Sequence, residues 1–366
     1  MKKILVVGMS RTVAGVGAVI LNVVSNLDRT KYEPVVLLTY ESESRRMLED
    51  MNIRIEKVTP FGENRRKYRS EIEQIFAKEH YDYVWINNTS KVNIDIFKVA
   101  KKYGAVTIAH SHGESVEGPL YKRIAFRLIE LFTTPVFYRN LDIAMACSKS
   151  SAQYFYSEKY RKTHRVYVMP NSIDVQKFMF RTDARESVRK EFGWNGSDVG
   201  MIFVGRLTQV KNPMLLVEMM RDLPVQYKLL FVGSGELQEE LEKKTREYGL
   251  DGKIRFAGSR RDVSRILSGA DLFLLPSFHE GLPVSALEAQ ANGLPCIISD
   301  TITDECMLLP SCRKAACNQQ SAWAEAVMKV SPQERILREE VPSEVKGADN
   351  AEYVAKFVKI LEQYVK

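Results

Sequence analysis

Short apolar runs alternate with helical patterns along the first half of the chain. The apolar run 4–8 is followed by a glycine-containing turn and then by apolar residues at helical spacing over 19–27. A second helical pattern occupies 95–103. The other strand-length apolar runs of this half are 34–38, 81–87, 106–110 and 141–148. Strands that alternate with helices predict a parallel, doubly wound α/β sheet with helices on both faces.

A polar stretch with Pro and Gly breakers interrupts this rhythm at 171–196. The alternation of strands and helices then restarts, with strand candidates at 200–205, 227–233, 253–257, 272–276 and 295–299. We therefore expect a first domain over 1–170, a linker over 171–196 and a second doubly wound domain over 197–350. The last stretch, 351–366, has Val354, Phe357, Val358, Leu361 and Val365 at helical spacing, so one face of a terminal helix must be buried.

Length and composition fit a globular protein with two domains. The chain has 366 residues, of which 45% are hydrophobic and 27% are charged, and it contains no low-complexity tract. No run approaches the roughly 18–20 apolar residues that span a bilayer, and 2–8 is too short for a signal peptide. The five cysteines lack paired CxxC spacing. We expect a cytoplasmic protein with free thiols and, in the absence of a D-x-D motif, no metal ion.

Positive charge is concentrated in the first half. Residues 1–170 contain 27 Lys and Arg against 18 Asp and Glu, whereas the remainder contains 26 against 28. This asymmetry favours an anionic partner for the first half, such as a membrane surface or a phosphorylated acceptor, although a merely solvated basic face gives the same count. No motif interleaves aromatic residues with this charge, so no nucleic-acid partner is expected.

The segment 120–139 combines basic and large apolar residues. Its cations are Lys122, Arg123, Arg127 and Arg139, and its apolar residues include Ile124, Leu128, Ile129, Leu131, Phe132 and Phe137. A basic helix of this kind can lie in the interface of an anionic membrane. The alternative is an apolar face buried against the sheet.

Charged residues follow two strands of the second half. Arg206 comes directly after the run 201–204, and Lys211 lies five residues further on, before a helix that opens at Pro213. Arg and Lys at a strand end suit a diphosphate, although solvated surface charges are the alternative. Glu280 and Glu288 stand on either side of seven residues after the strand candidate 272–276. This spacing lets one carboxylate reach a sugar and the other a ribose.

Glycine patterns argue against a dehydrogenase. The turn at 233–235 has the pattern Gly-Ser-Gly, and no G-x-G-x-x-G follows the first strand. The dinucleotide-binding fingerprint is therefore missing at the position where a Rossmann dehydrogenase needs it.

The string EGLPVSALE at 280–288 resembles the E-x7-E motif of retaining glycosyltransferase family 4. Three further motifs agree with that family in order and spacing. Residues 205–212 resemble its diphosphate-binding segment, 170–174 resemble the motif at the start of its interdomain linker, and 256–258 resemble its loop on the base side of the nucleotide. The resemblance covers essentially the whole chain. It implies the GT-B fold, in which two Rossmann-like domains face a central cleft. The first domain would be the acceptor side, the second would bind the nucleotide sugar, and the terminal helix would return to the first domain.

The resemblance also implies roles for individual residues. Those expected to act in catalysis are Arg206, Lys211, Glu280 and His112, the last from the segment His110-Ser111-His112-Gly113 after a strand. Those expected to bind the donor are Gly15, Gly17, Gly205, Gly233, Gly258, Gly281, Leu282, Pro283 and Glu288. Three positions depart from the family pattern: Ala14 and Ser172 stand where glycine is usual, and Asn212 stands where glycine often follows the lysine.

The expected function is transfer of a sugar, with retention, from a nucleotide diphosphate donor, preferably a UDP-sugar. The acceptor would be a glycan or lipid-linked molecule in surface polysaccharide or glycoconjugate synthesis. The nucleotide sugar is a substrate, so no cofactor is expected, and the enzyme would work in the cytoplasm or on the inner face of the membrane. The alternatives are a GT-B-like sugar-nucleotide epimerase and a non-catalytic sugar-nucleotide-binding protein.

Overall fold

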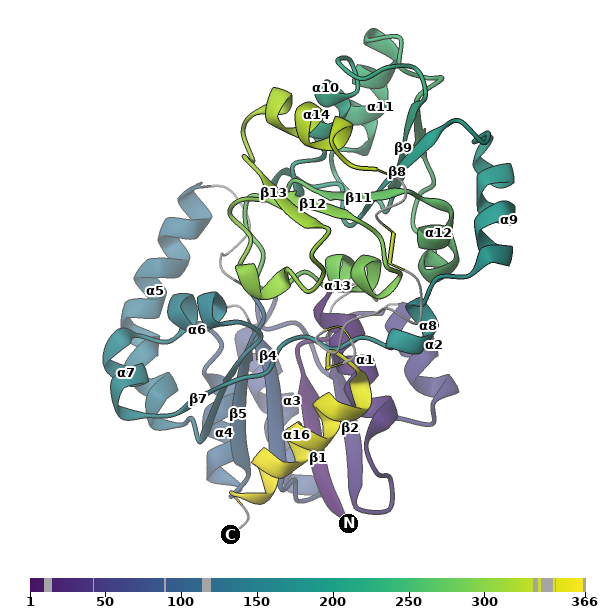
Figure 1. Ribbon diagram of the computed structural model, residues 1–366. Helices are drawn as coiled ribbons and strands as arrows, with labels where there is room; N and C mark the ends of the chain where they lie inside the picture. The colour runs from purple at the N-terminus through teal and green to yellow at the C-terminus, as the bar shows by residue number, and fades with distance from the viewer. Residues whose placement is uncertain are drawn as a thin grey trace. The chain divides into compact units, whose positions relative to one another are not determined.

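The structure is a computed structural model that divides into two compact units (Figure 1). It describes residues 1–9, 15–41, 43–88, 90–113, 120–331, 335–336, 345 and 347–364. The first unit comprises Met1–Ser172 together with Asn350–Lys366, and the second comprises Ile173–Asp349.

The first unit is built on a parallel sheet of seven described strands in the order β3-β2-β1-β4-β5-β6-β7. The strands are β1 Lys2–Val7, β2 Tyr32–Leu38, β3 Arg54–Lys57, β4 Tyr83–Asn88, β5 Val106–Ser111, β6 Ile143–Ala146 and β7 Val166–Val168. The helices are α1 Val16–Asn26, α2 Glu43–Asp50, α3 Arg65–Lys78, α4 Asp95–Lys102, α5 Leu120–Arg139, α6 Lys149–Phe155, α7 Glu158–Thr163 and α16 Asn350–Glu362.

This sheet is buried on both faces, which explains the continuous apolar runs of its strands. Ile4 of β1 belongs to a core cluster with Ile20 of α1 and Phe357 of α16. Leu5, the next residue along β1, belongs to a second cluster with Phe97 of α4. Because successive side chains of a strand point to opposite faces, each face of the sheet has its own apolar core.

The terminal helix α16 lies over the first sheet, where Figure 1 draws it in yellow. The ring of Phe357 lies 4.9 Å from the ring of Trp85, centroid to centroid, and both side chains are fully buried. The Tyr83 hydroxyl of β4 donates a hydrogen bond to the carbonyl of Leu361 at 3.1 Å. The end of the chain thus completes the core of the unit that contains its beginning.

The second unit repeats the plan with a parallel sheet of six described strands in the order β10-β9-β8-β11-β12-β13. The strands are β8 Val199–Val204, β9 Tyr227–Val232, β10 Ile254–Phe256, β11 Leu272–Leu275, β12 Cys296–Ser299 and β13 Cys312–Ala315. The helices are α8 Val175–Phe178, α9 Thr182–Phe192, α10 Pro213–Met219, α11 Gln238–Glu247, α12 Val263–Gly269, α13 Val284–Ala291 and α14 Gln320–Met328, with short 3₁₀ helices η1 Gln209–Lys211 and η2 Asp304–Cys306.

The stretch 171–196, expected to be an irregular linker, contains α8 and α9 instead. Only Ala184 and Val188 of α9 are buried, so its sequence shows little apolar periodicity. Polar contacts hold the helix in place: Arg185 and Arg189 donate to the buried carboxylate of Asp271 at 2.6 and 3.0 Å. These contacts join residues more than eighty positions apart in the sequence, so a local sequence pattern cannot predict them.

The contribution of α16 to the stability of the first unit can be tested by substitution of Phe357. Phe357→Ala removes a fully buried ring, so the free energy of unfolding of the first unit should fall by about 3–5 kcal/mol. Denaturant unfolding followed by the fluorescence of the adjacent Trp85 measures this change. Glu352→Ala, at an exposed position of the same helix, is the control and should change stability little.

Candidate active site

The second sheet reverses its strand order beside β8. From β8 the chain builds outward through β9 and β10, and it then returns to add β11 on the other side. Ligands of open parallel sheets bind beyond the carboxyl ends of the strands at such a reversal. Arg206 follows β8, and Glu280 follows β11, so two of the expected site residues lie at this switch point.

Lys211 and Glu280 form an ion pair at the switch point. The Lys211 ammonium donates to Oε1 of Glu280, and the hydroxyl of Ser277 donates to the same oxygen at 2.7 Å. The two charged side chains are only 18% and 12% exposed. The pair therefore orients Glu280 while leaving further N–H donors on Lys211 for an anionic ligand.

The loop that carries Lys211 is fixed by its neighbour Asn212. Asn212 has a φ of +52°, in the left-handed region that glycine and asparagine tolerate best. Its side-chain amide donates to the carbonyl of Cys317 at 2.9 Å, and the N–H of Phe278 donates to the carbonyl of Val210 at 2.8 Å. The departure from glycine thus keeps the required backbone conformation and adds a hydrogen bond.

The remaining expected residues of the second unit also lie at strand ends. Arg206 is exposed directly after β8. Gly233, after β9, has a φ of +137°, and a Cβ there would lie 1.9 Å from the carbonyl oxygen of Gly205, so only glycine fits. Its N–H donates to the carbonyl of Gly258 at 2.8 Å. These glycines hold neighbouring strand ends close together, which is sufficient reason for their presence even without a ligand.

The turn Gly281, Leu282 and Pro283 is buried and leads into α13, with Pro283 at its N-cap. Glu288 lies on this helix and is half-buried. Burial raises the pKa of Glu288 to about 8, against a smaller lowering by the positive charge of Lys177. At neutral pH the carboxyl group is therefore mainly protonated and can donate as well as accept a hydrogen bond.

In the first unit, Gly15 caps α1 with φ +58° and ψ −121°, a conformation that only glycine adopts readily. Gly17 is buried in the first turn of the same helix, which has no acidic side chain there. An uncompensated helix N-terminus attracts anions. Ala14 lies outside the described residues.

His112 is buried at the end of β5 and lies between two side-chain amides, of which its neutral ring can donate to one. Its Nε2 lies 2.8 Å from Oδ1 of Asn87, and its Nδ1 lies 3.2 Å from Oδ1 of Asn171. The amide nitrogen of Asn87 donates to the carbonyl of Val7. The amide oxygen of Asn87 can therefore accept a hydrogen bond from the Nε2–H group of His112. Burial lowers the pKa of His112 to about 4, so the ring is neutral at physiological pH.

His110 is part of the core. Its side chain is fully buried between the rings of Trp85 and His112, at centroid distances of 6.1 and 4.0 Å. Between the two histidines, the structure thus leaves His112 as the better candidate. Asn87 and Ser277 were not predicted from the sequence, although both lie at the carboxyl end of a strand, the position that identified the other candidates.

Comparison with family models assigns both halves of the chain. Residues 13–177 match the model described as Glycosyltransferase Family 4, and residues 184–338 match Glycosyl transferases group 1. The chain belongs to the GT-B glycosyltransferases of the family 4 type, as its motifs predicted.

Two bacterial proteins are among its relatives. Glycosyltransferase EpsF of Bacillus subtilis is 28% identical over 239 residues. An Escherichia coli enzyme, UDP-Gal:alpha-D-GlcNAc-diphosphoundecaprenol alpha-1,3-galactosyltransferase, is 29% identical over 248 residues. In both cases the aligned region spans 64% of this chain and 62% of the relative.

Solved structures share the fold over nearly the whole chain. Anabaena Alr3699/HepE in complex with UDP-glucose superposes with a TM-score of 0.83 and 17% identity, covering 99% of this chain and 100% of that one. Sucrose-phosphate synthase from Thermosynechococcus elongatus gives a TM-score of 0.80 and 17% identity, covering 99% of both chains. The predicted fold of two parallel-sheet α/β domains is therefore confirmed.

The raised pKa of Glu288 predicts a pH-dependent stability. A carboxyl group with a pKa of about 8 when folded and about 4.3 when unfolded binds more protons in the folded state between these pH values. Its contribution to stability therefore falls as the pH rises through this window. Glu288→Gln removes the titration, so the melting temperature of the variant relative to wild type should increase from about pH 5 to about pH 9.

Thermal unfolding across this pH range measures the difference. Glu325→Gln, which changes an exposed glutamate of α14, is the control and should run parallel to wild type. A Glu288→Gln curve that also runs parallel to wild type would show that the Glu288 carboxyl keeps its ordinary pKa.

Proposed function

We propose that this protein transfers a sugar from a nucleotide diphosphate donor, which binds at the switch point between β8 and β11. The observation that carries the proposal is the Lys211–Glu280 ion pair, oriented by Ser277, in a chain whose two halves match glycosyltransferase models. Arg206 and Lys211 would bind the diphosphate, and Glu280 would contact the transferred sugar. The turn 281–283 and Glu288 would line the sugar and ribose positions, with Gly205, Gly233 and Gly258 shaping the surrounding loops.

The donor is proposed to be a UDP-sugar. Two observations support this choice: the Escherichia coli relative is named for a UDP-galactose donor, and the HepE structure of the same fold holds UDP-glucose. Glu288, protonated at neutral pH, can both donate to and accept from the vicinal hydroxyls of a ribose.

Transfer is proposed to proceed with retention. The bond between the anomeric carbon and the diphosphate oxygen breaks first, and Arg206 and Lys211 stabilise the negative charge that develops on the leaving group. The departing diphosphate then takes the proton of the acceptor hydroxyl, which attacks on the same face of the sugar. Because two side-chain cations supply the positive charge, the proposal requires no metal ion.

Lys211→Met tests the donor site. Removing the ammonium should abolish the rise in melting temperature that UDP produces in the wild-type protein, and it should lower the transfer rate by about 100-fold or more. Lys243→Met, at an exposed position of α11, is the matched control and should behave as wild type. UDP, GDP, ADP and CDP are compared in the same thermal-shift assay.

The alternatives give different results in this experiment. An epimerase converts the UDP-sugar to its epimer without any acceptor, and a non-catalytic protein binds the nucleotide but releases no product. If no nucleoside diphosphate shifts the melting temperature of the wild-type protein, the donor-site assignment is wrong.

The acceptor is proposed to be a glycan or a lipid-linked saccharide, reached on the inner face of the membrane. The Escherichia coli relative is named for a diphosphoundecaprenol-linked acceptor. None of the helices in the described part of the chain has the length and hydropathy of a membrane span.

The helix α5 presents the surface for this contact. Its large apolar side chains include Ile124, Leu128, Leu131 and Phe132, which recur along one face and are 51%, 55%, 69% and 80% exposed. Burial against the sheet is therefore excluded for these four residues, whereas it is observed at the end of the helix. There Phe137 is fully buried, with its ring centroid 5.0 Å from that of Phe97.

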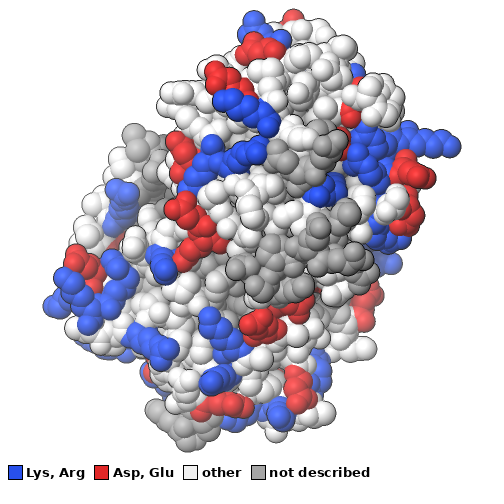
Figure 2. All heavy atoms as spheres, viewed as in Figure 1, with Lys and Arg blue, Asp and Glu red and all other residues white. Residues whose placement is uncertain are grey.

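Charge around α5 favours anionic lipids. The acidic residue of this helix, Glu130, bonds its own unit, because its carboxylate accepts a hydrogen bond from the backbone N–H of Lys91 at 2.7 Å. The basic residue Arg127, in contrast, is exposed. Tyr138 of α5 stacks on Tyr160 of α7 at 4.3 Å, which places the basic helix α7 beside it. Figure 2 shows Lys and Arg side chains gathered over α7.

Substituting two apolar residues of this surface should release the protein from vesicles. The double change Leu131→Ser and Phe132→Ser is expected to weaken binding to phosphatidylglycerol-containing vesicles by about tenfold or more, because each side chain loses its transfer into the lipid interface. Val225→Ser changes an apolar residue of the second unit that is 73% exposed, and it should leave binding unchanged. Co-sedimentation measures both, and equal sedimentation of the double variant and wild type would rule out α5 as the contact.

A further inference from the structure

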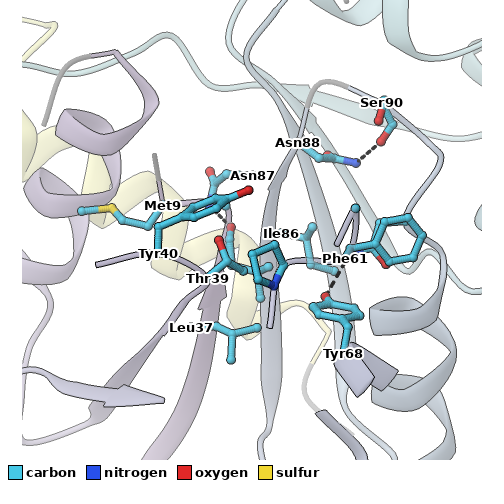
Figure 3. Close-up of a pocket in the computed structure, with 15 residues that line it drawn as sticks. Met9, Leu37, Thr39, Tyr40, Phe61, Tyr68, Ile86, Asn87, Asn88 and Ser90 are labelled. Carbon is cyan, nitrogen blue, oxygen red and sulfur yellow. Dashed lines mark hydrogen bonds between the residues drawn. The ribbon is translucent and has the colours of Figure 1, made fainter. Parts of the chain in front are cut away.

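Charge distinguishes the two points at which the sheets reverse their strand order. In the first unit this point lies between β1 and β4, and the cavity of about 280 Å³ there is lined by uncharged side chains such as Tyr40, Phe61 and Asn88 (Figure 3). In the second unit it holds the ion pair of Lys211 and Glu280. We therefore expect two ligands that differ mainly in charge to be distinguished in the second unit.

The backbones on either side of this ion pair are tied to each other. The N–H of Phe278 donates to the carbonyl of Val210 at 2.8 Å, and the side-chain amide of Asn212 donates to the carbonyl of Pro276 at 3.3 Å. These two hydrogen bonds join the loop after β8 to the loop after β11, directly beside the two charged residues. Because the backbones are fixed in this way, the ion pair changes most easily through rotation of its two side chains, which is a fast motion.

The carboxylate of Glu280 has room for a further partner. In the described part of the chain, both hydrogen bonds to this carboxylate fall on Oε1, one from the Lys211 ammonium and one from the Ser277 hydroxyl. A carboxylate offers two oxygens with about four acceptor positions, and sugar hydroxyl groups are donors. A sugar bound here thus competes with Lys211 for the carboxylate, while Ser277 continues to hold it.

Donor and product differ in the charge that they present to Lys211. The terminal phosphate of a nucleotide sugar is esterified to the sugar, whereas the same phosphate in a free nucleoside diphosphate loses a second proton with a pKa of about 6. The product therefore carries about one further negative charge at neutral pH. An ammonium without a counterion at this position would bind the product more tightly than the donor.

We propose that Glu280 gives this site its preference for the intact nucleotide sugar over the nucleoside diphosphate that is released. While the sugar is attached, its hydroxyl groups bond Glu280, and Lys211 is left to the diphosphate. Once the sugar has been transferred, Glu280 pairs again with Lys211, neutralises its charge and weakens the hold on the product. This role rests on the proposed function and adds product release to the sugar contact of Glu280.

Isothermal titration calorimetry with UDP, UDP-glucose and UDP-galactose tests this role. Glu280→Gln removes the negative charge and keeps the size of the side chain, so the charge of Lys211 stays uncompensated until an anion binds. The variant should therefore bind UDP about tenfold more tightly than wild type, or better. For the UDP-sugars, loss of the carboxylate acceptor offsets this gain, so their Kd should change by less than about threefold.

Two further variants show whether the effect passes through Lys211. When Glu280→Gln is combined with Lys211→Met, UDP should bind as weakly as it does to Lys211→Met alone, because the charge that Glu280 opposes is absent. Glu247→Gln is the control, since it also breaks an ion pair of this unit, with Lys244. Glu247 is the last residue of α11, about 15 Å along the helix from the end that follows β9, and its substitution should leave UDP affinity unchanged.

UDP affinity that is unchanged or weaker in Glu280→Gln overturns the role of Glu280 in product release and leaves the donor site standing. An equal gain for UDP and the UDP-sugars also overturns it, because removal of a negative charge alone would explain that result. If Glu280→Gln does not fold, Glu280→Asp, which keeps the charge on a shorter side chain, should give a smaller gain for UDP. If neither wild type nor a Glu280 variant binds UDP, the donor-site assignment is wrong, and the role of Glu280 with it.

Discussion

The reversal of strand order beside the first strand of each sheet is the constraint on which both candidate sites depend. In a parallel sheet, the strand order reverses at one point. The loops that follow the two adjacent strands there leave on opposite faces of the sheet, and a crevice opens between them. This happens between β1 and β4 and again between β8 and β11. The side chains that matter in each unit come from loops that follow these strands, although they are far apart in the sequence.

The two switch points differ in their chemistry. The one in the second unit contains an ion pair and an exposed arginine, so it is suited to an anionic ligand whose charge changes during a reaction. The one in the first unit is lined by amides and aromatic rings, and the neighbouring His112 is neutral because burial lowers its pKa. The same topology thus places charged side chains at the switch point of one unit and uncharged polar side chains at that of the other.

The sequence predicted what depends on local pattern and missed what depends on strand order. Strands buried on both faces were found from their apolar runs, whereas β3, β7 and β13, which are edge strands of three or four residues, were missed. Lys211 and Glu280 were found because each follows a strand within a known motif. The role of Asn87 depends on β4 lying beside β1, and that neighbourhood cannot be read from either segment alone.

The sequence of the helix α5 likewise does not reveal whether its apolar face is buried or exposed. Its apolar spacing is compatible with burial or with exposure, because periodicity reports that a face is apolar and not what covers it. Phe137 anchors one end of the helix in the core, and this fixes which side of the remaining turns is left outward. The carboxylate of Glu130 accepts a hydrogen bond from the backbone N–H of Lys91. The acidic side chain of α5 is therefore directed toward its own unit.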